Sequence, residues 1–111
     1  MVDITNNVIT IVQGDTLEVP IVIRTMDGSE FVPFDDDEIR FAVKEEHGAN
    51  NPVLIRKLIP TDTMILRLEA NETKNLQARK KLYVYDVELS TVDGYVDTFI
   101  RSHIRVLEEV D

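Results

Sequence analysis

The sequence has no cysteine and no tryptophan. Without cysteine the chain can form no disulfide, no thiolate metal site and no thiol nucleophile, so its stability has to come from an apolar core. No apolar run approaches the length of about 20 residues that a membrane-spanning helix needs. Residues 1–7 also lack the basic and apolar regions of a signal peptide. We therefore expect a protein that is made in the cytoplasm and does not enter a membrane.

Basic side chains are in the minority. The chain has 12 Lys and Arg residues against 21 Asp and Glu residues, which gives a formal net charge of −9. A protein with this charge repels phosphate backbones and anionic lipid surfaces. We expect neither nucleic acid nor a membrane among its partners.

Residues 82–90 carry the clearest structural signal in the chain. Their side chains alternate in polarity, so that one face is apolar and aromatic and the other is acidic, as in a half-buried strand. The apolar face consists of Tyr83, Tyr85, Val87 and Leu89, and the acidic face of Asp86 and Glu88. Asp93-Gly94 follows between two apolar runs, which is the strongest short-range signal for a hairpin. We predict a central strand here, with the next strand returning beside it.

The rest of the chain repeats short alternating runs between turn signals, with a second Asp-Gly turn at residues 27–28. We predict strands over residues 8–12, 17–23, 39–43, 53–59, 63–68, 96–100 and 104–106, a short helix over 70–78, and a bulge near Arg101-Ser102. Phe41 is expected to point into the core from its strand, and Leu76 from the helix. With 111 residues and this spacing, the chain is expected to form one all-β domain over residues 1–111, an antiparallel β-sandwich of about eight strands. The strands at 8–12 and 104–106 are the expected edges.

The acidic loop Asp35 to Glu38 is the first candidate site. Four carboxylates could bind Ca²⁺, but consecutive residues rarely converge on one ion and the spacing of a calcium-binding loop is absent. A solvated loop is the favoured interpretation. His47 and His103 lie in different segments with no second ligand at metal-binding spacing. We expect no metal site.

Catalytic residues are not indicated either. Ser29, Ser90 and Ser102 lack the glycine pattern of a nucleophile elbow. Asp86 and Glu88 are expected on the outer face of a strand rather than in a cleft. The basic run 79–81 is expected to be a solvated turn. We predict a protein that is not an enzyme and that has no cofactor.

Three stretches carry a resemblance to a known family: the turn at residues 13–16 (Gln-Gly-Asp-Thr), Phe41 to Lys44, and the strand at 83–89 before its Asp-Gly turn. The chain resembles small β-sandwich domains of tailed phages and Gram-positive prophages, notably the N-terminal domain of the upper-baseplate protein. The resemblance implies an immunoglobulin-like assembly module without an active site. It also implies a location in the virion, contacts with other virion proteins and, in the assembled particle, contacts between copies of the chain.

Two questions stay open at this point. The sequence ends at Asp111 without a stalk or receptor-binding region, so a baseplate, tail, neck or head position is equally consistent with it. The alternative function is a small-ligand or carbohydrate-binding module. Such a module needs an exposed aromatic platform, for which Phe31, Phe34 and Tyr95 are the candidates.

Overall fold

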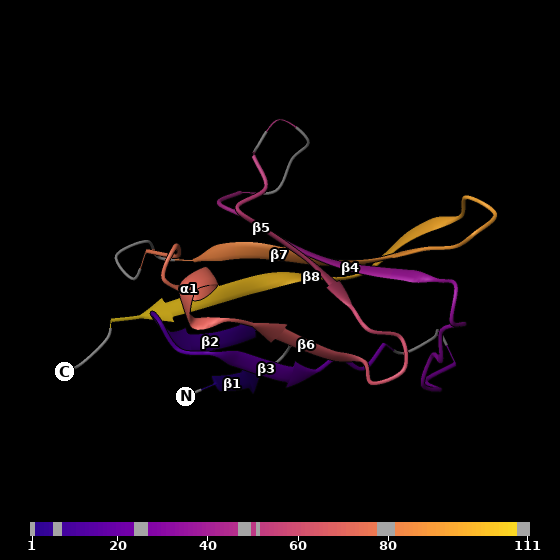
Figure 1. The fold of residues 1–111 in the computed structure, drawn as a ribbon, viewed down its shortest axis with the longest axis horizontal. Helices are drawn as coiled ribbons and strands as arrows, with labels where there is room; N and C mark the ends of the chain where they lie inside the picture. The colour runs from indigo at the N-terminus through magenta and orange to yellow at the C-terminus, as the bar shows by residue number, and fades with distance from the viewer. Residues whose placement is uncertain are drawn as a thin grey trace.

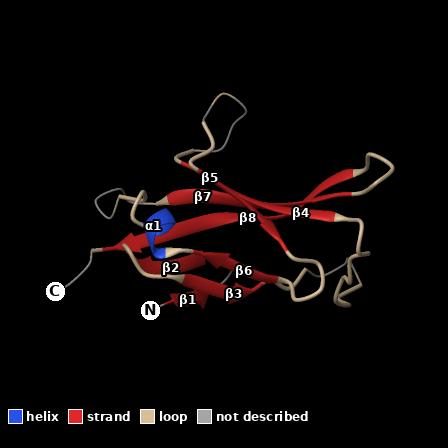
Figure 2. Cartoon of the chain, in the orientation of Figure 1, coloured by secondary structure: helices blue, strands red, loops and turns tan. Residues whose placement is uncertain are grey.

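The computed structural model describes residues 2–5, 8–23, 27–46, 50, 52–77 and 82–108. Within these residues the chain forms eight strands and one short helix (Figures 1 and 2). The strands are β1 (Val2–Thr5), β2 (Val8–Val12), β3 (Leu17–Pro20), β4 (Glu38–Lys44), β5 (Ile55–Ile59), β6 (Ile65–Leu68), β7 (Tyr83–Ser90) and β8 (Val96–Leu107), and the helix is α1 (Ala70–Thr73). None of these elements is a helix long and apolar enough to span a membrane.

The strands form two sheets of unequal size. Six strands make a curled sheet in the order β1-β2-β8-β7-β4-β5, and β3 pairs with β6 in a small second sheet. The small sheet lies against the hollow of the large one (Figure 1). All strand pairs are antiparallel except β2 and β8, which run parallel. The predicted mainly-β fold with one short helix is confirmed, whereas the prediction of purely antiparallel pairing is wrong at β2 and β8.

The predicted central strand is β7, which pairs with β8 on one side and β4 on the other. All four residues of its predicted apolar face are buried, whereas Asp86 and Glu88 are only partly buried. The chain turns back through residues 91–95, where Gly94 adopts a φ of 90°. The predicted hairpin and its inward face are confirmed.

The predicted edge strands are interior strands. β2 lies between β1 and β8, and β8 lies between β2 and β7. Residues 2–5, for which no strand was predicted, form β1 and pair with β2, so β2 is not an edge strand. The edges of the large sheet are β1 and β5. Both β2 and β8 direct buried apolar residues into the core, namely Ile9, Ile11, Ile104 and Val106.

The last strand is continuous, although two strands were predicted over 96–106. Val87 pairs with Ile100 and Glu88 pairs with Thr98, so Phe99 is the extra residue of a β-bulge. A bulge shifts the alternation of side chains without ending the strand. The bulge therefore exists, but two residues before its predicted position at Arg101-Ser102. β3 is three residues shorter than the predicted 17–23, since it ends at Pro20, which has no N–H for the ladder.

The core lies between the two sheets. Phe41 and Tyr85 are both buried, as predicted, with ring centroids 5.4 Å apart. The hydroxyl of Tyr85 shares a hydrogen bond with Ser102, and burial raises the pKa of Tyr85 to about 12. The hydroxyl of Tyr83 accepts a hydrogen bond of 2.7 Å from the N–H of Gln77. Both tyrosines thus have the partners that buried phenols require.

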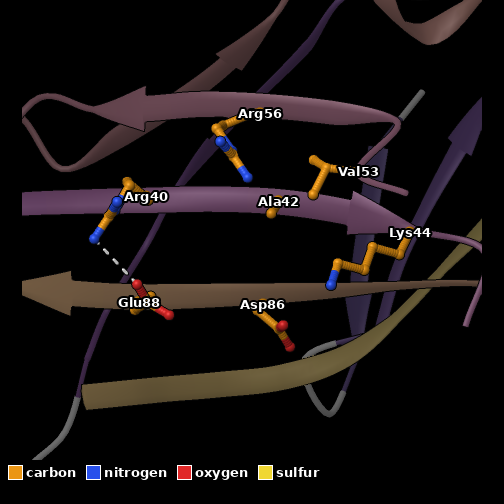
Figure 3. Close-up of a pocket in the computed structure, with 7 residues that line it drawn as sticks. All are labelled: Arg40, Ala42, Lys44, Val53, Arg56, Asp86 and Glu88. Atoms are coloured by element: carbon orange, nitrogen blue, oxygen red, sulfur yellow. Dashed lines mark ion pairs between the residues drawn. The ribbon is translucent and has the colours of Figure 1, made fainter. Parts of the chain in front are cut away.

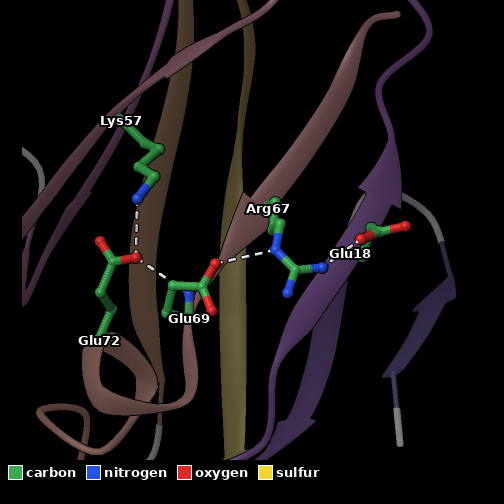
Figure 4. A network of polar contacts seen from close by, with 5 residues as sticks. All are labelled: Glu18, Lys57, Arg67, Glu69 and Glu72. Atoms are coloured by element: carbon green, nitrogen blue, oxygen red, sulfur yellow. Dashed lines mark hydrogen bonds and ion pairs between the residues drawn. The ribbon is translucent and has the colours of Figure 1, made fainter.

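Helix α1 is shorter than the predicted 70–78, but Leu76 points into the core as predicted. Glu69 and Glu72 form a capping box, in which Glu72 accepts the N–H of Glu69 at 2.9 Å. Glu72 also accepts a hydrogen bond of 2.8 Å from Lys57 of β5, and Arg67 of β6 bridges Glu69 and Glu18 of β3 (Figure 4). This network joins the edge of the large sheet to the small one.

Candidate functional site

A pocket of about 180 Å³ opens on the face of the large sheet that is turned away from the core (Figure 3). The register explains how it forms. Ala42 lies opposite Asp86 of β7 on one side and Arg56 of β5 on the other, and its small side chain leaves room between longer neighbours. The lining residues are Arg40, Ala42, Lys44, Val53, Arg56, Asp86 and Glu88.

The charges of the pocket are only partly neutralised. Arg40 Nη2 lies 3.2 Å from Glu88 Oε1, and Asp86 Oδ1 lies 3.4 Å from Arg101 Nε on β8. The buried Nε of Arg40 has no hydrogen-bond partner in the described part of the chain. Arg56 forms no ion pair with any described residue. Because Arg presents a planar fork of donors, Arg56 can still bind a carboxylate.

The composition and volume of the pocket limit what it can hold. No Ser, Thr, Tyr or His is among its lining residues. Its volume is below the range of about 300–1,000 Å³ that is usual for small-molecule sites. It has room for one side chain of a partner, with guanidinium groups beside it. Asp86 and Glu88, predicted as solvated residues on an outer face, do lie on that face and are held in ion pairs there.

The acidic loop is not uniformly solvated. Asp37 is buried and accepts the N–H of Phe34 at 2.9 Å, while its own N–H donates to the Phe34 carbonyl at 3.1 Å. It therefore holds the loop together. Asp35, Asp36 and Glu38 are exposed. Within the described ranges, no group of three or more His, Asp or Glu side chains is placed to hold a metal ion.

The other candidate residues are not brought together. Ser29 donates its N–H and its hydroxyl to Asp27, Ser102 bonds to Tyr85, and Ser90 ends β7. His103 is exposed on β8. His47 and the basic run 79–81 lie outside the described residues. No catalytic set forms among the serines and the histidine that the structure describes.

The most unusual surface is at one end of the molecule, which we call the hairpin end. Glu38 pairs with Ser90, and Ile39 pairs with Ile59, so the start of β4, the end of β5 and the β7–β8 turn lie side by side. Figure 1 shows this turn projecting beyond the sheet. Six exposed apolar residues lie in or next to these segments: Val92 (73%), Tyr95 (59%) and Val96 (54%) at the β7–β8 turn, Leu58 (60%) in β5, and Val32 (76%) and Phe34 (76%) in the loop before β4. The predicted exposure of Phe34 and Tyr95 is confirmed, whereas Phe31 packs against the core.

The hairpin end is also strongly acidic. Residues 27–38 contain six carboxylates, residues 58–65 one and residues 90–98 two, and none of these segments contains Lys or Arg. The opposite charge lies on the outer face of the large sheet. Five basic residues share that face through the strand registers, namely Arg40, Lys44, Arg56, Arg101 and Arg105. Within the net charge of −9, the acidic and basic residues are therefore concentrated on different surfaces.

The turn of the hairpin is held by its own hydrogen bonds. The N–H of Thr91 donates to the Tyr95 carbonyl at 2.8 Å, and the N–H of Gly94 donates to the Thr91 carbonyl at 3.0 Å. The Thr91 hydroxyl accepts the N–H of Tyr95 at 3.1 Å and donates to Asp93. That hydroxyl lowers the pKa of the Asp93 carboxyl. Val92 and Tyr95 are thus displayed on a turn that is held by its own hydrogen bonds.

No family model matches the sequence, and no curated protein matches it. Its function has to be inferred from the two surfaces described above. Sequence reasoning found the aromatic residues of the hairpin end but missed the pocket. The only signal for the pocket was the small Ala42 between Arg40 and Lys44, and this has meaning only once the strand register is known.

Proposed function

We propose that this chain is a structural module of a phage or prophage particle and that it works through contacts with other proteins of the virion. The observation that carries the proposal is the hairpin end, where Val92, Tyr95 and Val96 are all more than half exposed within five residues of the β7–β8 turn. Scattered apolar residues are normal on any surface, but a gathered patch with a polar rim is typical of a protein-binding site. The resemblance to phage assembly modules supports a position in the virion.

The backbone offers a second kind of contact. β1 and β5 are the edges of the large sheet, and an edge strand presents unpaired N–H and C=O groups to a neighbour. Repeated copies in a symmetric particle make weak individual contacts sufficient. The immunoglobulin-like topology belongs to the same proposal. In it, the large curled sheet is one layer of a sandwich whose second layer is reduced to β3 and β6.

Mass spectrometry of purified particles, induced from a lysogen that encodes the chain, tests this function. The chain should be found in intact particles at a constant ratio to the known tail and head proteins. A matched lysogen with the double substitution Val92→Ser and Tyr95→Ser should lose the chain from the particles, while Leu107→Ser should retain it. Absence of the unaltered chain from particles that contain the other virion proteins would refute the proposal.

A small-ligand or carbohydrate-binding module is the alternative function. The exposure of Phe34 and Tyr95 favours it, because aromatic faces stack on sugar rings. Thermal denaturation in the presence of a panel of mono- and oligosaccharides at millimolar concentration would test it. A rise in melting temperature that Tyr95→Ser abolishes would favour this alternative over the assembly module.

A further inference from the structure

The hairpin end and the basic sheet face have complementary properties. The hairpin end presents exposed apolar residues on a rigid turn, surrounded by carboxylates. The sheet face presents a pocket for one side chain, lined by three cationic residues, Arg40, Lys44 and Arg56, and by Asp86 and Glu88. The two surfaces lie on different parts of the same chain. Complementary surfaces on different parts of one chain are what a head-to-tail contact between copies requires.

We propose that the hairpin end of one copy docks on the outer face of the large sheet of a second copy, with Tyr95 entering the pocket beside Arg56. This inference rests on the proposed function, since it names another copy of the chain as one partner of the assembly module. Such a contact is heterologous, because the two copies use different surfaces. Repeating it gives a ring when the rotation closes and a filament when it does not.

Three observations favour Tyr95 as the residue that enters the pocket. Tyr95 is 59% exposed on a turn that projects beyond the sheet, so its ring can reach a neighbour. The pocket of about 180 Å³ is too small for most small-molecule ligands but accommodates a single side chain. Arg40, Lys44 and Arg56 surround it, and cations of this kind interact favourably with an aromatic face.

The charges favour this orientation over a symmetric one. Asp93 and Asp97 flank Tyr95 and would meet Arg56 and the basic rim of the pocket, where an unused guanidinium fork can bind a carboxylate. A two-fold contact between two hairpin ends would instead bring two strongly acidic surfaces together. Like charges facing each other oppose association. The acidic surface therefore selects the basic face.

The contact should be weak in isolation. A hairpin tip with its flanking loop covers less area than a standard interface of about 800 Å² on each partner. We expect a dissociation constant on the order of 100 μM for a single contact. Because charges contribute, association should weaken when salt shortens the Debye length from about 20–30 Å to a few ångströms.

Sedimentation velocity of the purified chain from about 10 μM to 1 mM tests the inference. In low salt the weight-average sedimentation coefficient should rise with concentration, and about 0.5 M NaCl should reduce the rise. Tyr95→Ser and Arg56→Glu should each weaken association at least about tenfold, the effect expected of a central anchor. Lys74→Glu, outside both surfaces, and Leu107→Ser, on the outer face of β8 but not in the pocket lining, are the controls and should associate like the unaltered chain. Circular dichroism melting curves verify that all four variants are folded.

Mixing the two defective variants gives the decisive result. Arg56→Glu keeps an intact hairpin end, and Tyr95→Ser keeps an intact pocket, so an equimolar mixture should form 1:1 complexes that neither variant forms alone. A symmetric contact would show no such rescue, and this outcome would overturn the inference. A chain that stays monomeric at about 1 mM in low salt, or that associates more strongly in high salt, would also overturn it. Detection of such a monomeric chain in virions would leave the proposed function intact.

Discussion

Replacing Leu76 by alanine tests whether the segment after α1 is part of the core. Leu76 is fully buried although it lies in an otherwise polar stretch, residues 74–77. Its backbone is fixed on both sides. The Leu76 carbonyl accepts a hydrogen bond of 2.9 Å from Gln13 Nε2, its N–H donates to the Thr73 carbonyl at 3.1 Å, and the next N–H donates to Tyr83. The chain cannot easily move into the space that the missing methyl groups leave.

A cavity that does not collapse places the cost in the upper part of the usual range for Leu→Ala, at about 3–5 kcal/mol. A domain of this size has a free energy of unfolding of about 5–15 kcal/mol, so the loss is a large fraction of the total. With a urea dependence of about 1.5 kcal/mol/M, the midpoint should fall by about 2–3 M. Urea denaturation followed by far-ultraviolet circular dichroism measures this shift.

Leu58→Ala is the matched control for Leu76→Ala, because the same atoms are removed from a side chain that is 60% exposed. It should change the free energy of unfolding by less than about 0.5 kcal/mol. If Leu76→Ala cost less than about 1 kcal/mol, or no more than the control, Leu76 would not be a core residue. The packing of residues 74–77 described above would then be wrong.

Substitutions at three further positions test local features. Because the pKa of Tyr85 is raised from 10.0 to about 12, the folded chain keeps between these pH values a proton that the unfolded chain loses, and stability should fall as pH rises through this window. Tyr85→Phe should make that fall less steep in urea denaturation curves, and the reasoning fails if the slope is unchanged. Lys57 and the Glu69 N–H lower the pKa of Glu72 below 4.5, so the stabilisation is present above pH 4.5 and is lost as pH falls. Glu72→Gln should lower the free energy of unfolding by about 0.5 kcal/mol at neutral pH. It should have no effect at the lowest pH at which the domain stays folded. An equal loss at both pH values would contradict this reasoning. Gly94 has a φ of 90°, and an added Cβ would meet no atom within 4 Å. Gly94→Ala should therefore lower the free energy of unfolding by about 1 kcal/mol through backbone strain alone, as measured in melting experiments. Gly94→Asn should cost less, because Asn adopts positive φ more readily. If Gly94→Ala left the melting temperature unchanged, the backbone of the turn would have relaxed to accommodate the alanine.

Local patterning was sufficient for the strands that carry the core. β4 and β7 place buried residues at alternate positions, because each has one face on the core and the other on solvent. Tyr83 and Tyr85 could be assigned to the inner face from the alternation with Asp86 alone. The turn at Asp93-Gly94 was also a local property, since its glycine adopts positive φ. These features depend on a few neighbouring residues only.

The order of the strands was not a local property. β2 and β8 pair in parallel through Ile9 with Ile104 and Ile11 with Val106, residues that lie near opposite ends of the chain. Nothing in either segment specifies the other, because both simply present alternating apolar residues. β1 has only four residues, too few for the period of two to stand out. The predicted edges were wrong for this reason.

The pocket and the hairpin end show the same limit for function. Every residue of the pocket was visible in the sequence, but Arg40, Arg56 and Asp86 become neighbours only through the registers of β4 with β5 and with β7. The shift at Phe99 likewise decides which residues of β8 share the face with Arg101. A sequence pattern assigns a residue to one of two faces. It does not say which residues of three strands meet on that face.

The distribution of charge changes what the net charge of −9 means for partners. Taken as a single number, it disfavours anionic partners everywhere on the surface. The fold, however, gathers five basic residues on the outer face of one sheet and leaves the segments of the hairpin end without any. Because fields from exposed charges fall off within about 10 Å at 0.1 M salt, a partner docking on the sheet face responds to the local basic residues rather than to the distant carboxylates. The acidic hairpin end and the more basic sheet face lie on different surfaces, and the proposed head-to-tail contact uses this separation of charge.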